Sequence, residues 1–166
     1  TGEQIINDGD INAWTFVNLI GALRRIAQAI AYLHQRGIKH TDLAITNVMF
    51  NEKKEIKVID YESTYKYSLF VRMDISRMKK MFTRLSLKET NSQFVYDIDQ
   101  AFSKWFTQPN AYDRYFAARL GEIINGVYTN KLRYNQAVEI ANELDELYTD
   151  LLKYESYKAQ GKINEF

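Results

Sequence analysis

The sequence predicts a mostly helical α+β fold with one small β-hairpin. Apolar residues recur at helical spacing in five segments that together cover most of the chain. Only one region, residues 48–50 and 56–59, has the short β-branched and aromatic runs of paired strands, and a polar turn at 51–54 joins them. The chain has 166 residues, of which 46% are hydrophobic, so it can bury one sizeable core but not two full domains.

A first long helix is expected after a turn at residues 8–10, with Asn12 as its N-cap. Gly37 follows the last apolar position and suits the left-handed turn that ends many helices. The apolar positions of this helix are Trp14, Val17, Ile20, Leu23, Ile26, Ile30 and Leu33.

Four more helices are expected after the hairpin, over residues 69–85, 92–107, 111–126 and 134–158, with Pro109 in a turn. In the last helix an apolar stripe predicts core packing: Val138, Ala141, Leu144, Leu147 or Tyr148, Leu151 and Leu152. In the helix at 69–85, Ile75, Met78 and Phe82 are expected to face inward. The nearby basic residues are interpreted as its solvated side, with a docking site for an acidic substrate as the less favoured alternative: Arg72, Arg77, Lys79, Lys80, Arg84 and Lys88.

Candidate chemistry lies in the loop before the hairpin and directly after it. His40, Asp42 and Asn47 have the spacing His-x-Asp-x-x-x-x-Asn, and Asp60 follows the second strand. Asp42 offers an oxygen that can accept or steer a hydroxyl proton, while Asn47 and Asp60 offer the hard oxygen ligands that Mg²⁺ prefers. Phosphoryl transfer needs these two functions, an aimed acceptor and neutralised phosphate charge, and little else from the protein.

With these residues, the chain resembles the C-terminal, catalytic lobe of the protein-kinase-like superfamily. The loop has the spacing of a kinase catalytic loop, and residues 58–62 stand where kinases carry Asp-Phe-Gly. The resemblance implies that Asp42 is the catalytic aspartate and that Asn47 and Asp60 bind the metal and the nucleotide. It implies structural support of the catalytic loop by His40 and by Asp74 in the following helix.

Departures from the usual pattern indicate a compact, atypical kinase. Thr41 replaces an arginine used in regulation, Ala44 replaces a phosphate-contacting lysine, and Glu62 replaces the glycine of Asp-Phe-Gly. Only fourteen positions separate Asp60 from Asp74, and Ala-Pro-Glu is missing, so a full activation segment is not expected. This pattern is similar to RIO-type kinases and to small-molecule kinases that act on aminoglycosides, choline or lipopolysaccharide sugars.

The resemblance implies an ATP- and Mg²⁺-dependent phosphotransferase that phosphorylates a hydroxyl acceptor, with a protein favoured, as for a serine/threonine kinase. A sugar or lipopolysaccharide-type small-molecule kinase and a pseudokinase or regulatory binding module are the alternatives. The sequence contains no glycine-rich loop or Val-Ala-Ile-Lys strand before the catalytic loop. An N-terminal lobe is therefore expected from the same protein or a separate subunit, with residues 1–11 as a remnant of the connection between lobes and residues 1–166 alone inactive.

Composition excludes several other classes. The 22 basic and 21 acidic side chains nearly cancel, which argues against nucleic-acid binding by bulk charge. The absence of cysteine excludes disulfides and thiolate zinc sites and fits a cytoplasmic protein. No signal peptide and no apolar run long enough for a membrane span are expected.

Overall fold

The computed structural model describes residues 1–38, 43–58, 68–90, 97–129 and 137–166. It confirms the predicted class, because helices dominate and the described strands form one two-stranded antiparallel sheet. The α-helices are α1 (Gly2–Asn7), α2 (Phe16–Gln35), α3 (Ser68–Leu87), α4 (Ile98–Trp105), α5 (Ala111–Thr129) and α6 (Ala137–Ala159). The strands are β1 (Val48–Phe50) and β2 (Ile56–Val58), and the short 3₁₀ helices are η1 (Asp10–Ala13), η2 (Ile45–Asn47) and η3 (Ile163–Glu165).

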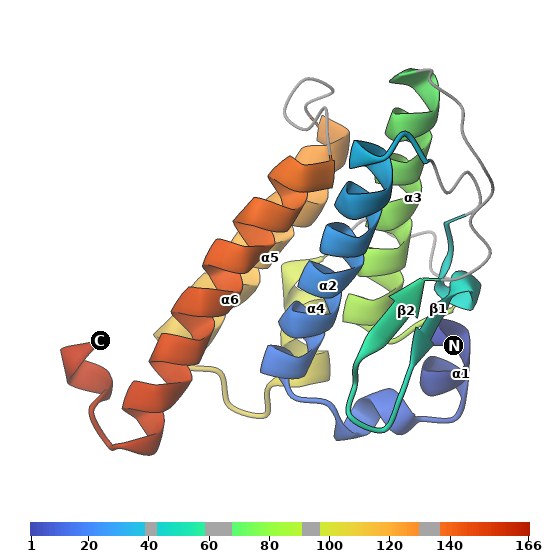
Figure 1. Ribbon diagram of the computed structural model, residues 1–166. Helices are drawn as coiled ribbons and strands as arrows, with labels where there is room; N and C mark the ends of the chain where they lie inside the picture. The colour runs from blue at the N-terminus through green and yellow to red at the C-terminus, as the bar shows by residue number, and fades with distance from the viewer. Residues whose placement is uncertain (39–42, 59–67, 91–96, 130–136) are drawn as a thin grey trace.

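Helix α2 lies at the centre of the molecule. Figure 1 shows it between α6 on one side and α3 on the other, with the hairpin and α1 gathered beside it. Its contact with α6 is the most extensive between any two described elements. Half of its twenty residues are buried, as expected for a helix packed on several sides.

The predicted start of α2 at Asn12 is wrong. Thr15 is the N-cap, and its side-chain oxygen accepts a hydrogen bond from the backbone N–H of Asn18 at 3.2 Å. Asn18 returns the interaction, because its side chain accepts from the backbone N–H of Thr15 at 2.9 Å. Asn12 instead lies in η1, and the buried Trp14 precedes the helix.

The predicted end of α2 is confirmed. Gly37 has a φ of 73°, in the left-handed region, and its N–H donates to the carbonyl of His34 at 3.1 Å. The N–H of Ile38 donates to the carbonyl of Leu33 at 2.9 Å, which completes a Schellman motif. The chain therefore leaves α2 in a fixed direction immediately before the loop that holds the candidate catalytic residues.

The later helices follow the predicted pattern with local differences. The predicted 92–107 helix is the shorter α4, since Asp97 accepts hydrogen bonds from Asp99 and Gln100 through Oδ1 and so caps the helix start. On α6, Ala141, Leu144, Leu147 and Leu151 are buried as predicted. Leu152, however, is 44% exposed, and the inward position one turn after Leu151 belongs to Tyr154.

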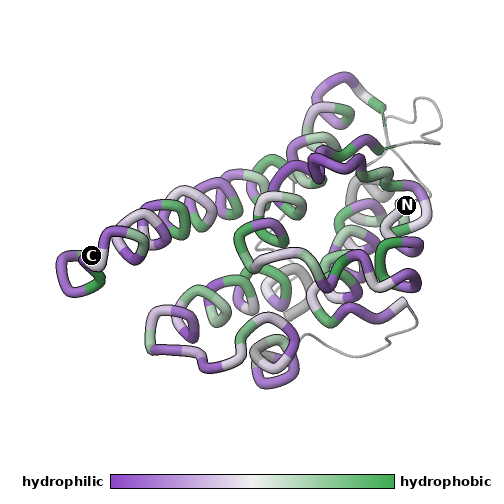
Figure 2. The backbone as a smooth tube through the Cα atoms, turned by 90° about the horizontal axis from the view of Figure 1, so that it is seen from below, coloured by the Kyte–Doolittle hydropathy of each residue, from purple (hydrophilic) through white to green (hydrophobic). Residues whose placement is uncertain are grey.

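Tyr154 joins the C-terminal part of the chain to α5. Its ring packs beside Phe116 and Phe166, with centroids 5.4 and 5.5 Å away, and its hydroxyl accepts a hydrogen bond from Asn110 at 2.7 Å. Figure 2 shows hydrophobic and hydrophilic residues alternating along α6, as expected for a helix with one packed face. Among the described residues, none of the helices combines the length and apolar character needed to cross a lipid bilayer.

Candidate active site

The candidate loop enters the described structure at Leu43 and is anchored by buried apolar side chains. Leu43 is 2% exposed and Ile45 is 3% exposed, so both insert into the core on either side of Ala44. The chain then forms η2, in which the N–H of Asn47 donates to the carbonyl of Ala44 at 2.9 Å. Core packing thus fixes the backbone that carries Asn47.

Asn47 lies at the junction of η2 and β1, and its side chain is partly exposed. In the hairpin, Val48 pairs with Val58 and Phe50 pairs with Ile56. The pairing holds the residue that follows Asn47 opposite the last described residue of β2. The predicted metal ligand Asp60 is two residues further along the chain and lies outside the described residues, as do Asp42 and His40.

Asp74 lies in the second turn of α3 and is fully buried. Its Oδ2 is 2.7 Å from Nε2 of His34 in the last turn of α2. Nδ1 of His34 is buried without a hydrogen-bond partner in the described part of the chain. A ring that donates from Nε2 to the carboxylate of Asp74 satisfies this contact.

Sequence reasoning missed His34 as the partner of Asp74. The signal was available, since His34 lies four residues after Ile30 and so continues the inward face of α2. The pair ties the end of α2 to α3, just before the candidate loop. Asp74 therefore supports the contact between α2 and α3. His40, for which a supporting role is predicted, lies outside the described residues.

Helix α1 packs against the same loop. A Cβ atom built on Gly2 would lie 2.8 Å from the backbone oxygen of Ile45 and 3.1 Å from its Cβ. Only glycine permits this close approach of α1 to η2. Residues 1–11, predicted only as a remnant connection, thus include a helix that supports the backbone preceding Asn47.

Met49 is a second residue that sequence reasoning missed. It is 39% exposed, whereas its neighbour Val48 is fully buried and Phe50 packs edge-on against Trp14 at 5.1 Å. Because side chains alternate along a strand, Met49 lies on the side of β1 opposite to Val48 and Phe50. An apolar side chain exposed two residues from the candidate metal ligand is suited to contact a flat, apolar ligand group.

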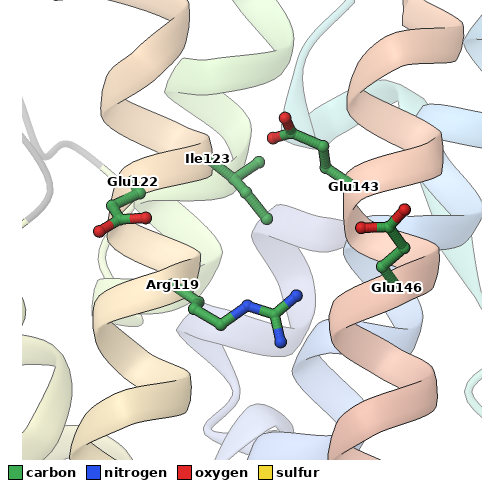
Figure 3. Close-up of a pocket in the computed structure, with 5 residues that line it drawn as sticks. All are labelled: Arg119, Glu122, Ile123, Glu143 and Glu146. Atoms are coloured by element: carbon green, nitrogen blue, oxygen red, sulfur yellow. The ribbon is translucent and has the colours of Figure 1, made fainter.

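A cavity of about 180 Å³ between α5 and α6 is not part of this site. Figure 3 shows Arg119 extending from α5 toward α6, and Glu143 and Glu146 extending from α6 into the same space. Nη1 of Arg119 is already 2.7 Å from Oδ2 of Asp150. None of the elements that line this cavity carries a candidate catalytic residue.

The similarity to known proteins lies in the segment that contains the candidate loop and the hairpin. A family model described as protein kinase domain matches residues 15–74. A 3-deoxy-D-manno-octulosonic acid kinase of Vibrio parahaemolyticus is 30% identical over 70 residues, which are 41% of this chain and 29% of that protein.

Two eukaryotic proteins show shorter matches. A protein of Dictyostelium discoideum named a probable serine/threonine-protein kinase is 46% identical over 46 residues, 28% of this chain and 7% of that protein. Ephrin type-A receptor 5 of Gallus gallus is 40% identical over 55 residues, 33% of this chain and 5% of the receptor. The chain therefore spans less than a third of the length of each of these relatives.

Proposed function

Because this chain belongs to the protein-kinase-like superfamily, we propose that it forms the catalytic lobe of a phosphotransferase that uses ATP and Mg²⁺ to phosphorylate a hydroxyl acceptor. One observation carries the proposal. The anchored loop and the hairpin register bring Asn47 to the hairpin end from which the chain continues to Asp60. In this proposal both predicted metal ligands act at this end of the hairpin.

Each polar residue has a separate task in the proposed reaction. Asp42 orients the acceptor hydroxyl, whose oxygen attacks the γ-phosphorus while the bond to the β–γ bridging oxygen breaks. The electron pair leaves with ADP, and the hydroxyl proton passes to Asp42 or to solvent.

The oxygen donors of Asn47 and Asp60 match the preference of Mg²⁺ for carboxylate and amide oxygens. When bound, the metal neutralises charge on the phosphate oxygens. His34 and Asp74 hold the neighbouring helix ends together and touch none of the reacting groups in this scheme.

Met49 is assigned to the nucleotide base. Its side chain is exposed two residues after Asn47, so it offers an apolar surface to the base of a nucleotide whose phosphates meet the metal. Contacts with the rest of the triphosphate would come from an N-terminal lobe, in the same protein or in a separate subunit. The chain alone is then expected to be folded but inactive, because a one-sided site does not offset the entropy of holding the triphosphate.

Two acceptor classes are supported by different relatives. A protein hydroxyl fits the match to the protein kinase domain and to a relative named as a serine/threonine-protein kinase. A small sugar acid fits the match to a 3-deoxy-D-manno-octulosonic acid kinase. In both cases the reaction at phosphorus and the tasks of Asp42, Asn47 and Asp60 are the same.

Replacing Asp42 tests the proposed reaction. In the complete protein, Asp42→Asn is expected to lower the rate of phosphoryl transfer by about 10²–10⁴, since a positioned acid or base contributes roughly that factor. ATP affinity should stay within about twofold of the parent, because Asp42 does not hold the metal in this scheme. Transfer is measured with γ-labelled ATP and affinity by calorimetric titration.

The same measurements separate the proposal from its main alternative. Equal transfer rates in the parent and Asp42→Asn would remove Asp42 from the reaction. ATP binding without any transfer by the parent, to proteins or to sugars, would favour a pseudokinase. Arg25→Gln, an exposed change on α2, serves as the control variant and should match the parent.

A further inference from the structure

The basic residues of α3, and Lys88 directly after it, divide into groups with different surroundings. Lys79 is only 4% exposed, which corrects its predicted place on the solvated side. Lys88 lies over the ring of Trp105 at 4.2 Å and donates to the carbonyl of Lys104 at 2.9 Å. Neither is available to a ligand in the way that an open surface lysine is.

Three other cations face the candidate loop. Arg77, Lys80 and Arg84 are spaced at i, i+3 and i+7 along α3, so they share one side of the helix. With Met81 and residues 43–45 they line a cavity of about 310 Å³. No acidic side chain is among the lining residues in the described part of the chain.

The cavity combines a basic wall with an apolar floor. Leu43, Ile45 and Met81 are each no more than 3% exposed, and Ala44 adds only a methyl group. Nε of Arg84 is buried and has no hydrogen-bond acceptor within the described residues. A carboxylate or phosphate oxygen is the acceptor whose charge and geometry fit the guanidinium groups that line the cavity.

We propose that this cavity binds the carboxylate or phosphate group of a small acidic acceptor, with Arg84, Lys80 and Arg77 as its cationic contacts. The inference rests on the proposed phosphotransfer, because Leu43, which lines the cavity, directly follows Asp42 in the sequence. The lining favours the small acid among the two acceptor classes, because three cations around a cavity of about 310 Å³ match a compact anion.

Binding is tested on the complete protein with gluconate, inorganic phosphate and glucose, followed through the backbone amide signal of Ala44 by NMR. Gluconate and phosphate are expected to shift this signal saturably, whereas glucose, which matches gluconate but lacks its charge, is not. In Lys80→Gln and Arg84→Gln the dissociation constants should rise at least fivefold, and they should rise with added salt in the parent. Arg25→Gln, which removes an exposed cation from α2, should bind as the parent does.

Lys80→Gln keeps the test valid if Arg84→Gln fails to fold, because Lys80 is exposed whereas Arg84 is only partly exposed. Equal binding of glucose and gluconate, or dissociation constants in both variants within twofold of the parent, would overturn the proposal. The proposal would also be overturned if a glutamate-rich octapeptide bound at least tenfold more tightly than gluconate and if this binding were lost in Lys80→Gln. That result would identify a peptide-binding surface instead.

A MgATP titration of the same samples keeps this result separate from the proposed reaction. A parent that binds gluconate but not MgATP would refute the phosphotransfer and leave the anion site standing. A parent that binds MgATP and transfers phosphate, but binds gluconate no better than glucose, would refute the anion site alone.

Discussion

Burial separates the two candidate residues that the structure describes. Asn47 is partly exposed at a strand end, where a side-chain oxygen can meet a ligand. Asp74 is fully buried inside α3 and receives a hydrogen bond from His34 at 2.7 Å. The first position suits metal binding, and the second suits holding two helices together.

The metal assignment predicts an order of effects. Asp60→Ala should abolish Mg²⁺-dependent ATP binding in the complete protein, because it removes the one charged oxygen assigned to the metal. Asn47→Ala should weaken binding less, since it removes a neutral donor. Calorimetric titrations of both variants with and without Mg²⁺ give the order, and an Asp60→Ala variant that binds MgATP as tightly as the parent would contradict the assignment.

Lys79 predicts a pH dependence of stability. Burial lowers the pKa of its ammonium group to about 8, compared with 10.5 for an ordinary lysine. Between these two values the unfolded chain binds more protons than the folded one, so the free energy of unfolding rises with pH. Below pH 8 the lysine is charged in both states and the full cost of burying the charge remains.

The comparison is between the complete protein and its Lys79→Met variant, which has an unbranched, uncharged side chain that is one atom shorter. The Tm of the parent should rise relative to that of the variant, by a few degrees, between pH 7 and pH 9.5. Lys80→Met, at an exposed neighbour, is the control and should show no such trend. A parallel pH dependence in parent and Lys79→Met would mean that Lys79 is not buried as a charge.

At the scale of elements, the candidate loop is held from three sides. The Schellman motif at Gly37 directs the chain into it, buried Leu43 and Ile45 anchor its far part, and α1 packs against η2 through Gly2. The positions of the candidate residues in this loop therefore depend on elements that take no part in the proposed chemistry. Changes in those elements should reach the reaction through backbone displacement.

Gly2→Ala tests this dependence. The added Cβ would lie 2.8 Å from the carbonyl oxygen of Ile45, so η2 or α1 must move, at a cost of about 1–3 kcal/mol for overpacking. We expect phosphoryl transfer to fall by up to about 10²-fold, since a displacement of about 1 Å has that effect on a positioned group.

Gly161→Ala is the matched control. Gly161 has a φ of 70° and no neighbour within 4 Å of a built Cβ, so alanine there strains the backbone far from η2. Both variants should have a lower Tm in thermal unfolding. At temperatures where both are fully folded, only Gly2→Ala should have a lower rate of phosphoryl transfer than the parent. Equal activities at matched stability would show that α1 does not position the loop.

Helical periodicity predicted the fold well because the inward faces of α2, α3 and α6 repeat at helical spacing. It failed where one local interaction decides where a helix begins. The reciprocal hydrogen bonds of Thr15 and Asn18 make Thr15 the N-cap of α2 in place of Asn12. Lys79 could have been predicted as buried, since it lies four residues after Ile75 and three before Phe82, but its charge masked the pattern. Of the candidate site, Asn47 and Asp74 come from motif spacing alone, and their roles stay predictions. Met49, Gly2 and the basic cavity depend on how separate elements meet, which the sequence does not show.

At the scale of the whole molecule, the core joins the two ends of the sequence. Helix α2 packs most extensively against α6, about a hundred residues later in the chain. Arg24 and Asp145 add an ion pair of 2.7 Å across this contact, and Gly21 lets Tyr148 approach so closely that a Cβ would lie 3.2 Å from its ring. The helix that precedes the candidate loop is thus supported by the last long helix.

This contact has a consequence during translation. When α2 leaves the ribosome, the residues that will cover its apolar face have not been synthesised, and at about 5–20 residues per second α6 follows roughly 5–20 s later. Over that interval the nascent chain exposes Leu19, Leu23 and Ile30, which are fully buried in the folded protein. We therefore expect a nascent α2 to bind chaperones that recognise apolar segments at the tunnel exit. The support that α6 gives to the helix preceding the candidate loop comes only after α6 is made.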